Sequence, residues 1–317
     1  MLQVNVSRKA NAAEGVCSFE LIPVNGETLP PFEAGAHIDV HIPGGLIRQY
    51  SLCNDPRERN RYLIGVLKEP SSRGGSEAMH SVVDQGDILT ISAPRNLFKL
   101  DHSAARHLLF AGGIGITPIL AMAYELDHRR ADFELHYCFR SSERAAFVKT
   151  LAEAPFADRV VLHDDSGPQQ QKLNAAALLD TLDEGRHLYV CGPAGFMKHV
   201  LETGGAAGWP QERMHREFFA GQTIDHDANA SFEVVLARSG RTFDVPADRT
   251  VFEVLDEAGV EIETSCEQGV CGTCVTRVLE GIPDHKDQFM TADEHARNDC
   301  FTPCCSRAKS PRLVLDL

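Results

Sequence analysis

The sequence predicts a chain of three domains: an antiparallel β-barrel, an α/β domain with a parallel sheet, and a β-grasp domain. Three observations predict this multidomain fold class. Short alternating segments separated by proline and glycine fill residues 1–101, apolar strands alternate with helical segments over 102–225, and 226–317 carry a cysteine-rich loop between a predicted helix and strand. A chain of 317 residues is also too long for one ordinary hydrophobic core.

The composition is that of a soluble globular protein, with 43% hydrophobic and 24% charged residues. The net charge of −14 argues against a nucleic-acid partner, because binding phosphates requires a basic surface. No apolar run approaches the roughly 18 residues of a membrane span, and no basic-then-apolar segment opens the chain. We therefore predict a cytoplasmic protein with no membrane partner. Outside the cysteine-rich region the cysteines lack the spacing of a disulfide framework, which favours reduced thiols.

The first domain contains a segment, residues 36–42, in which apolar and polar residues alternate as in a strand. His37 and His41 fall on one face of this segment. No third metal ligand accompanies them in the sequence, so we expect both to be surface residues.

Two other segments of the predicted barrel suit a flavin. In Arg48-Gln49-Tyr50-Ser51-Leu52, strand geometry sends the arginine and the tyrosine to the same side. A guanidinium can pair with phosphate, an aromatic ring can cover the flavin, and a hydroxyl can reach a ring nitrogen. Arg73-Gly74-Gly75-Ser76 precedes a predicted helix at 77–83 with Ser76 as its N-cap, and its glycines let backbone N–H groups approach an anion. A single phosphate needs no adenine pocket, which favours FMN over FAD.

The second domain begins with a buried strand at 107–111 that runs into Gly112-Gly113-Ile114-Gly115-Ile116-Thr117-Pro118 and a helix at 119–126. Pro118 suits the first helical turn, although it stands where the common dinucleotide fingerprint has a third glycine. The next strand, 134–139, ends in Arg140-Ser141-Ser142-Glu143, where a parallel sheet would hold the nucleotide ribose. Arg140 favours a 2′-phosphate and Glu143 disfavours it, so the preference for NADH over NADPH is slight.

Two later segments complete the predicted nucleotide site. Strands at 159–163 and 187–190 follow, and the second leads into Cys191-Gly192-Pro193, where the glycine leaves room for a nicotinamide. Cys191 is not expected to be a nucleophile, because no neighbouring residue in the sequence supplies a base. Phe218 and Phe219 follow a further extended piece and by pattern alone resemble core residues.

The third domain follows a polar linker at 221–230 and carries Cys266, Cys271 and Cys274 in a glycine-rich loop. Their x4 and x2 spacing matches a plant-type [2Fe–2S] site, which needs four thiolates. A fourth ligand is offered by Cys304, after 29 intervening residues, with Cys300 and Cys305 as competitors. Structural zinc is the alternative, yet zinc sites rarely have a third cysteine five residues ahead of a pair. A hairpin at 232–236 and 241–245, a helix at 251–258, and strands at 275–279 and 312–317 predict a β-grasp fold.

Taken together, these segments resemble the phthalate dioxygenase reductase family of class IA Rieske oxygenase reductases, and within it the vanillate O-demethylase reductase branch. The resemblance rests on "RQYSLCNDP", "RGGS", "AGGIGITP" and the ending "CCSRAKSPRLVLDL". It implies that FMN contacts the strand at 64–68 and is held by Arg48, Tyr50, Ser51, Leu52, Gly74, Gly75, Ser76 and Thr117, with Phe219 closing over the flavin. It implies that NADH is bound by Gly113, Gly115, Pro118, Cys191, Gly192 and Pro193, while Arg140 is a candidate contact from its place at the end of a parallel strand. The family's Cys-x-Ser-Arg-Ala ending supports Cys304 as the fourth cluster ligand, beside Cys266, Cys271 and Cys274.

The resemblance also implies a function. The chain would pass electrons from NADH through FMN and a [2Fe–2S] cluster to a Rieske-type oxygenase component, with the chemistry carried by cofactors and with no catalytic acid or nucleophile of its own. Two alternatives remain open at this point. One is a reductase for another acceptor, such as a P450, a cytochrome or a ferric chelate, and the other is a redox sensor.

Overall fold

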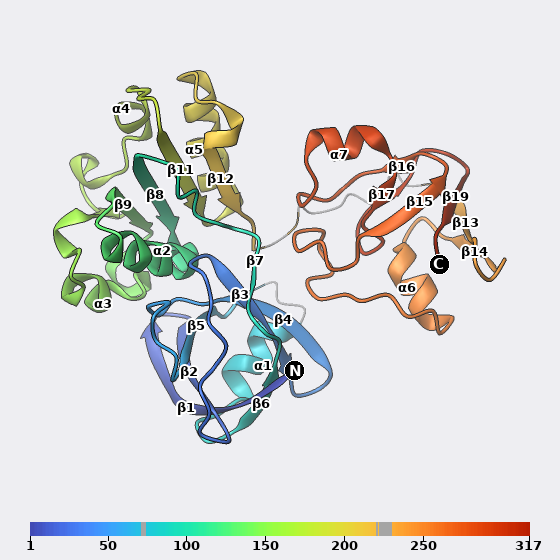
Figure 1. Ribbon diagram of the computed structural model, residues 1–317, viewed down its shortest axis with the longest axis horizontal. Coiled ribbons are helices and arrows are strands. Elements are labelled where there is room, and N and C mark those ends of the chain that lie inside the picture. Colours follow the sequence, from blue (N-terminus) through green and yellow to red (C-terminus); the bar gives the residue numbers. More distant parts are fainter. Residues whose placement is uncertain (71–73, 220, 222–229) are drawn as a thin grey trace. The chain divides into compact units, whose positions relative to one another are not determined.

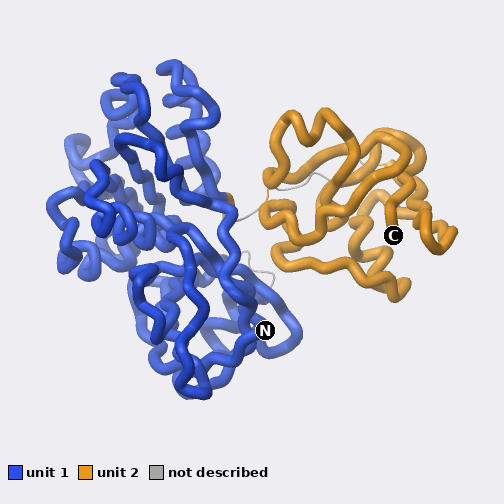
Figure 2. Tube along the Cα trace, in the orientation of Figure 1, with its two compact units in different colours: residues 1–217 blue, residues 218–317 orange. Residues whose placement is uncertain are grey.

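The computed structural model describes residues 1–70, 74–219, 221 and 230–317. It divides into two units, Met1–Glu217 and Phe218–Leu317 (Figure 2). The predicted boundary after residue 101 falls in the segment that joins the first sheet to the second. The boundary after residue 225, Arg73 and most of the predicted linker lie outside the described residues. The three domain limits therefore stay predictions.

The first unit opens with an antiparallel sheet in the order β4-β3-β6-β1-β2-β5, with β7 paired to β3 (Figure 1). An isolated bridge between Leu52 and Ile64 brings the β4 edge against β5, which closes the predicted barrel around an apolar interior. Its elements are β1 (Leu2–Ala13), β2 (Val16–Pro23), β3 (Ala36–Ile42), β4 (Leu46–Ser51), β5 (Tyr62–Leu67), α1 (Gly75–Ser81), β6 (Ile88–Ile91) and β7 (Arg95–Asn96).

One expectation for this barrel was wrong. His37 is 4% exposed rather than on the surface, because β7 pairs with the start of β3 and sets Arg95 opposite His37. Burial lowers the pKa of His37 to about 4. His41, four residues further along the same strand, is half-buried.

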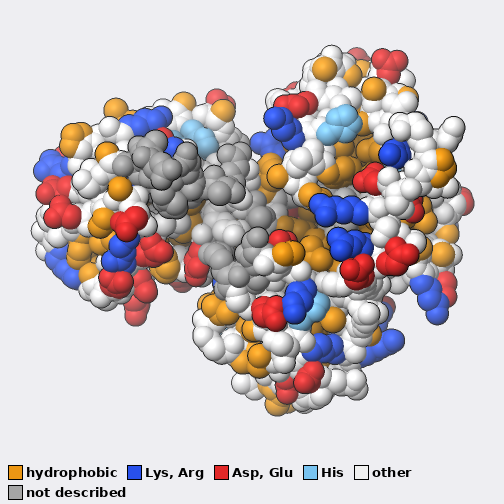
Figure 3. Space-filling model, turned by 180° about the vertical axis from the view of Figure 1, so that it is seen from behind, with side chains coloured by type: hydrophobic (Ala, Val, Ile, Leu, Met, Phe, Trp, Pro, Cys, Tyr) orange, Lys and Arg blue, Asp and Glu red, His pale blue; other side chains and the backbone are white. Residues whose placement is uncertain are grey.

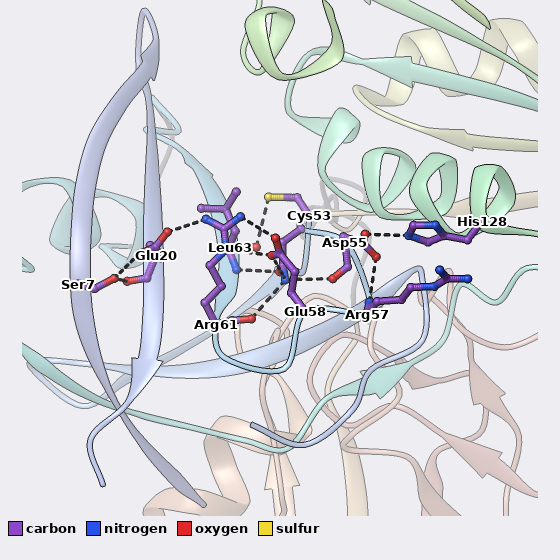
Figure 4. A network of polar contacts seen from close by, with 10 residues as sticks. Ser7, Glu20, Cys53, Asp55, Arg57, Glu58, Arg61, Leu63 and His128 are labelled. Carbon is purple, nitrogen blue, oxygen red and sulfur yellow. Dashed lines mark hydrogen bonds and ion pairs between the residues drawn. The ribbon is translucent and has the colours of Figure 1, made fainter. Parts of the chain in front are cut away.

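A polar network holds the loop between β4 and β5 (Figure 4). Arg61 pairs with Glu20 of β2 at 2.6 Å and with Glu58 at 2.9 Å. Asp55 contacts Nε2 of His128 at 2.7 Å, and His128 ends the first helix of the α/β part. The network therefore fixes the loop that follows Ser51 and Leu52 and joins the barrel to the α/β part of the same unit.

The second sheet is parallel throughout, in the order β10-β9-β8-β11-β12. Because β8 and β11 are parallel neighbours, the loops after them open at the same edge of the sheet. Helix α2 packs on β8, β9 and β11, and α5 packs on β11 and β12 (Figure 1). The elements are β8 (Arg106–Gly112), α2 (Ile116–His128), β9 (Asp132–Phe139), α3 (Val148–Glu153), β10 (Val160–Asp164), α4 (Ala175–Leu179), β11 (Arg186–Cys191), α5 (Ala194–Ala206) and β12 (Met214–Glu217), with short 3-10 turns that include η1 (Gly113–Gly115).

The second unit has a mixed sheet in the order β14-β13-β19-β15-β17 and a small pair β16-β18. The predicted hairpin, helix and strands of the β-grasp fold are all present, and Thr250 and Thr291 close capping boxes at the starts of α6 and α7. The elements are β13 (Phe232–Leu236), β14 (Thr242–Val245), α6 (Val251–Glu257), β15 (Thr276–Glu280), β16 (Pro283–Asp284), α7 (Ala292–Arg297), β17 (Cys300–Phe301), β18 (Arg307–Ala308) and β19 (Arg312–Leu315).

Arg307, near the end of the second unit, is a buried arginine that links three separate backbone positions. It is 4% exposed, and its guanidinium donates hydrogen bonds to the backbone carbonyls of Arg249, Pro246 and Ala230. Its guanidinium also lies 5.1 Å from the ring centroid of Phe232. One buried cation therefore satisfies three acceptors from segments far apart in the sequence.

Two further expectations concern the whole chain. None of the helices in the described parts of the chain is long and apolar enough to cross a membrane. All ten cysteines are described, and none of them forms a disulfide with another.

Candidate functional site

The four cysteines predicted to bind iron come together in the second unit as two pairs. Cys266 and Cys271 are hydrogen-bonded to each other, and the sulfurs of Cys274 and Cys304 lie 3.3 Å apart. All four are buried, with 3–8% exposure. A two-iron cluster needs two thiolates on each iron, so two adjacent pairs of cysteine sulfurs are a donor set that fits the group.

The loop that carries three of these cysteines has the backbone that such a site requires. Gly269 and Gly272 adopt φ of 71° and 70°, and Glu267 adopts 53°. A Cβ on Gly269 would lie 2.4 Å from the sulfur of Cys305, and one on Gly272 would lie 2.3 Å from the ring of Phe289. Only glycine suits these two positions, because both the positive φ and the lack of space exclude a side chain.

The two competing cysteines have other neighbours. Cys305 is 2% exposed, but its sulfur contacts the hydroxyl of Thr302 at 3.2 Å and sits against Gly269. Cys300 is half-buried on β17, opposite Arg277 of β15. Of the three candidates for the fourth ligand, Cys304 is therefore the one whose sulfur is paired with a loop cysteine.

A group of His285, Asp287 and His295 lies beside the cysteine loop, with its ligand atoms within 4.8 Å of one another. The two imidazole rings stack, with centroids 4.3 Å apart and planes inclined by 19°. A metal binds an imidazole nitrogen close to the plane of the ring, so two stacked rings do not converge on one ion. Asp287 is instead satisfied by Nε2 of His295 at 3.1 Å and the backbone N–H of Met290 at 2.8 Å. Its Cα also packs against Gly269, so the group braces the cysteine loop.

In the first unit, the two predicted flavin segments lie against each other. A Cβ on Gly75 would lie 2.5 Å from Cγ and 2.7 Å from Nε of Arg48, so the arginine crosses directly over this glycine. Burial raises the pKa of Tyr50, which keeps its phenol protonated. One detail was wrong: the N-cap of α1 is Gly74, at φ 87°, and the hydroxyl of Ser76 instead accepts a hydrogen bond from the N–H of Glu69. Helix α1 starts two residues earlier than predicted, which moves Ser76 into its first turn.

Thr117 joins the barrel to the nucleotide loop. It is 1% exposed, and a Cβ on Gly65 of β5 would lie 2.9 Å from its Cγ2. Its hydroxyl donates to the carbonyl of Ile114 at 3.0 Å. Pro118 lies in the first turn of α2, as predicted, but the helix begins at Ile116 rather than 119.

The two glycine loops of the nucleotide domain are in contact. A Cβ on Gly115 would lie 2.2 Å from the carbonyl oxygen of Cys191, and one on Gly192 would lie 2.9 Å from Cα of Gly112. Pro193 is the N-cap of α5. Burial, with a smaller contribution from Glu217, raises the pKa of Cys191 well above its usual value, so its thiol stays protonated. This agrees with the expectation that Cys191 is not a nucleophile.

Glu217 is a residue that the sequence analysis missed. It ends β12, beside Cys191 of β11, and its Oε2 accepts a hydrogen bond from the hydroxyl of Ser51 at 3.2 Å. Burial of the carboxyl raises its pKa to about 8, an effect that the Ser51 hydrogen bond only partly offsets. A proton-bearing carboxyl therefore stands between the predicted flavin strand and the predicted nicotinamide loop. The sequence feature that could have identified Glu217 is its position at the carboxyl end of a parallel strand, where open α/β sheets bind their ligands.

Arg140 and Phe219, two of the predicted site residues, are both exposed. Arg140 is exposed after β9, next to Ser141, whose side chain lowers the pKa of Glu143 by hydrogen bonding. Phe219 is 39% exposed and belongs to the second unit. On the face of the first unit seen in Figure 3, Lys and Arg side chains gather between apolar ones, despite the acidic net charge. Such a surface suits a ligand that has both phosphates and rings.

Comparison with known proteins agrees with this geometry. Residues 234–309 match the family model of the 2Fe-2S iron-sulfur cluster binding domain. Residues 91–214 match the N-terminal domain of the dimethylamine monooxygenase subunit DmmA-like family.

Full-length relatives define the class more closely. The chain is 58% identical to a vanillate O-demethylase oxidoreductase of a Pseudomonas species, over 100% of both chains. A solved structure of phthalate dioxygenase reductase is 40% identical, with a TM-score of 0.79 over 100% of this chain and 98% of that one. An intact type IV self-sufficient cytochrome P450 monooxygenase is 37% identical, with a TM-score of 0.86, over 100% of this chain and 41% of that one.

Fold and site together define an electron-transfer oxidoreductase that uses a pyridine nucleotide, a flavin and a [2Fe–2S] cluster. It is a reductase subunit that serves an oxygenase. The chain belongs to the phthalate dioxygenase reductase family. The expected family and three-part architecture are thereby confirmed.

Proposed function

We propose that this chain passes electrons from NADH, through FMN and a [2Fe–2S] cluster, to a Rieske-type oxygenase component that demethylates vanillate. The observation that carries the proposal is the 58% identity to a vanillate O-demethylase oxidoreductase over the full length of both chains. Bound flavin supplies the essential chemistry, because it takes two electrons from a nicotinamide and releases them singly. The protein contributes binding, orientation and electrostatics.

For the cluster we propose the ligands Cys266, Cys271, Cys274 and Cys304. The pairing of their sulfurs and their burial support this set, and the glycines of the loop let backbone N–H groups turn inward. A plant-type cluster has a potential of about −400 mV and a Rieske centre about −150 mV or above. At 59 mV per decade for one electron, this gap favours export by about four decades.

For the flavin we propose FMN, held by the two barrel segments and the nucleotide loop. The close approach of Arg48 to Gly75 supports a phosphate site there, because a guanidinium over bare backbone offers donors from both. Thr117 packs against Gly65, on the strand that lies next to the β4 edge. The full proposed set is Arg48, Tyr50, Ser51, Leu52, Gly74, Gly75, Ser76 and Thr117, with Phe219 as a cover for the ring.

For the nucleotide we propose NADH, across the loops after β8 and β11 and past Arg140. Two carboxylates support the absence of a 2′-phosphate. Asp164 ends β10 and is held by Ser166, and Glu143 is held by Ser141. Hydrogen bonding lowers the pKa of both, so both remain charged and repel an added phosphate. The proposed loop residues are Gly113, Gly115, Pro118, Cys191, Gly192 and Pro193.

A second candidate function is supply of electrons to a P450. The likeness to a self-sufficient P450 monooxygenase over 100% of this chain favours it. The fold alone does not separate the two acceptors, so the test must compare them directly.

The deciding experiment measures coupled turnover with purified components. NADH oxidation and vanillate demethylation are followed with a vanillate-demethylating Rieske oxygenase and, in parallel, with a P450. We expect product formation only with the first; coupled turnover with the P450 alone would refute the proposal. Flavin released on denaturation should be FMN, and NADH should outperform NADPH at equal concentration. FAD in the supernatant, or faster turnover with NADPH, would correct those two assignments.

The ligand set is tested by substitution. Cys304→Ser should abolish the visible spectrum of the cluster, whereas Cys300→Ser and Cys305→Ser should retain it. The reverse pattern would reassign the fourth ligand to Cys300 or Cys305.

A further inference from the structure

Cys17 and Cys300 are the two cysteines of this chain that are not fully buried, and they have different surroundings. The sulfur of Cys17 lies 3.6 Å from Nδ1 of His80, within the reach of a hydrogen bond to sulfur. Burial and the neighbouring charge of Asp299 raise the pKa of the Cys300 thiol. No histidine in the described part of the chain is hydrogen-bonded to Cys300. Of the two accessible thiols, Cys17 is therefore the one with a base beside it.

The imidazole of His80 is oriented by a backbone carbonyl. Its Nε2 lies 2.9 Å from the carbonyl oxygen of Val66. A carbonyl oxygen can only accept a hydrogen bond, so Nε2 carries the proton of the neutral imidazole and Nδ1 keeps its lone pair. Nδ1 is therefore the acceptor for the thiol proton of Cys17. A nucleophile, a base and a group that orients the base, all within reach of one another, form the arrangement that activates a cysteine.

Several elements of the barrel hold this pair in place. Cys17 lies on β2 directly opposite Val66 of β5, and His80 lies in the last turn of α1. Nζ of Lys9, on β1, donates hydrogen bonds to the backbone carbonyls of His80 and Val83, each at 2.7 Å. These bonds fix the end of α1 against the sheet. Cys17 and His80 are both half-buried, so the pair is held by the fold and is still within reach of solvent.

We propose that Cys17 is a site of reversible covalent modification by low-molecular-weight disulfides, with His80 as the base that activates it. The sulfur of Cys17 attacks one sulfur of the disulfide while Nδ1 of His80 takes the thiol proton. A mixed disulfide forms on Cys17, the S–S bond of the reagent breaks, and the released thiolate takes the proton back from His80. The reagent is the oxidant, because its released half leaves as a reduced thiol. The inference goes beyond the proposed function, since neither residue belongs to the proposed flavin, nucleotide or cluster sets.

The test treats the full-length holoprotein with 2-hydroxyethyl disulfide, a small uncharged disulfide, and follows the adduct at each cysteine by peptide mass spectrometry. Cys17 should react at least about tenfold faster than Cys300, and dithiothreitol should remove the adduct. His80→Gln keeps a side-chain N–H for the carbonyl of Val66 but cannot take up a proton, so the rate at Cys17 should fall at least about tenfold. His199→Gln is the control, because His199 is exposed on α5 and its substitution should leave the rate unchanged.

The outcomes separate this inference from the proposed function. Similar rates at Cys17 and Cys300, or no adduct at Cys17, overturn the inference, and this comparison needs no variant. A smaller fall than expected in His80→Gln would mean that exposure alone sets the reactivity, which also overturns it. Should His80→Gln fail to fold, the comparison of the two cysteines in the unmodified protein decides. None of these results bears on the electron acceptor, and coupled turnover with a P450 alone would refute the proposed function without affecting the inference.

Discussion

Glu217 allows a quantitative test of the site. Burial raises the pKa of its carboxyl from 4.5 to about 8, so the folded protein holds a proton there that the unfolded chain releases above pH 4.5. Stability from this group is fully present below pH 4.5 and is lost as the pH rises towards 8. Raising the pKa from 4.5 to about 8, at about 1.36 kcal/mol for each pH unit, sets an upper bound of about 5 kcal/mol.

The full bound is not expected, because Glu217 as a residue is only half-buried and solvent screens part of the charge. We expect about 2 kcal/mol. Glu217→Gln replaces the carboxyl with a neutral group of the same shape, so it should match the parent at pH 5 and be more stable by about 2 kcal/mol at pH 9. In a unit of this size that corresponds to roughly 4–8 °C in the midpoint of thermal unfolding.

The assay is thermal unfolding of the holoprotein at pH 5 and pH 9, followed by far-UV circular dichroism. Glu212→Gln is the control, because Glu212 is exposed just before β12. Rapid-mixing measurements of flavin reduction by NADH give a second readout: a carboxylate beside the hydride acceptor opposes transfer, so the rate should fall above pH 8 in the parent and stay level in Glu217→Gln. Equal stability differences at both pH values, or a less stable variant at pH 9, would refute the reasoning.

Three other outcomes follow from the packing. Gly115→Ala places a Cβ 2.2 Å from a backbone oxygen, and in urea titrations it should lower the free energy of unfolding by about 3 kcal/mol. Gly195→Ala is the control, because Gly195 faces open space on α5 and its substitution should cost nothing. Arg307→Met leaves three buried carbonyls without their donor and should cost about 3 kcal/mol or more, seen as earlier thermal bleaching of the cluster. Burial lowers the pKa of His107 and His136 to about 4. As the pH falls from 6.5 to 4, each histidine should therefore reduce the free energy of unfolding by about 1.4 kcal/mol per pH unit. Urea titrations measure this, and a flat profile would contradict it.

Local patterns were sufficient for much of the fold. The alternation at 36–42 and the apolar run at 107–111 predict strands because side-chain direction and burial depend on near neighbours, and both strands are present. The spacing of Cys266, Cys271 and Cys274 predicts a loop whose sulfurs lie on one side, because these residues are also close to one another in the sequence. Segments that differ from their prediction do so at helix starts, where caps depend on one or two residues.

The remaining features depend on contacts between distant segments. Ser51 and Glu217 are 166 residues apart, so no local pattern could indicate that the first donates to the second. His37 looked exposed because the strand that covers it, β7, is only two residues long.

The residues that distinguish one electron acceptor from another are a small part of the molecule. Two solved structures that match the full length of this chain, at 40% and 37% identity, are those of a phthalate dioxygenase reductase and of a self-sufficient cytochrome P450 monooxygenase. The shared fold therefore does not by itself select the acceptor. Exposed side chains beside the cysteine loop are the remaining candidates for recognising the acceptor. They include Phe289, which is 38% exposed with its ring against Gly272, and Val275, which is 37% exposed next to Cys274. A partner that docked here would bury these apolar side chains, and their loss of water would contribute to its affinity.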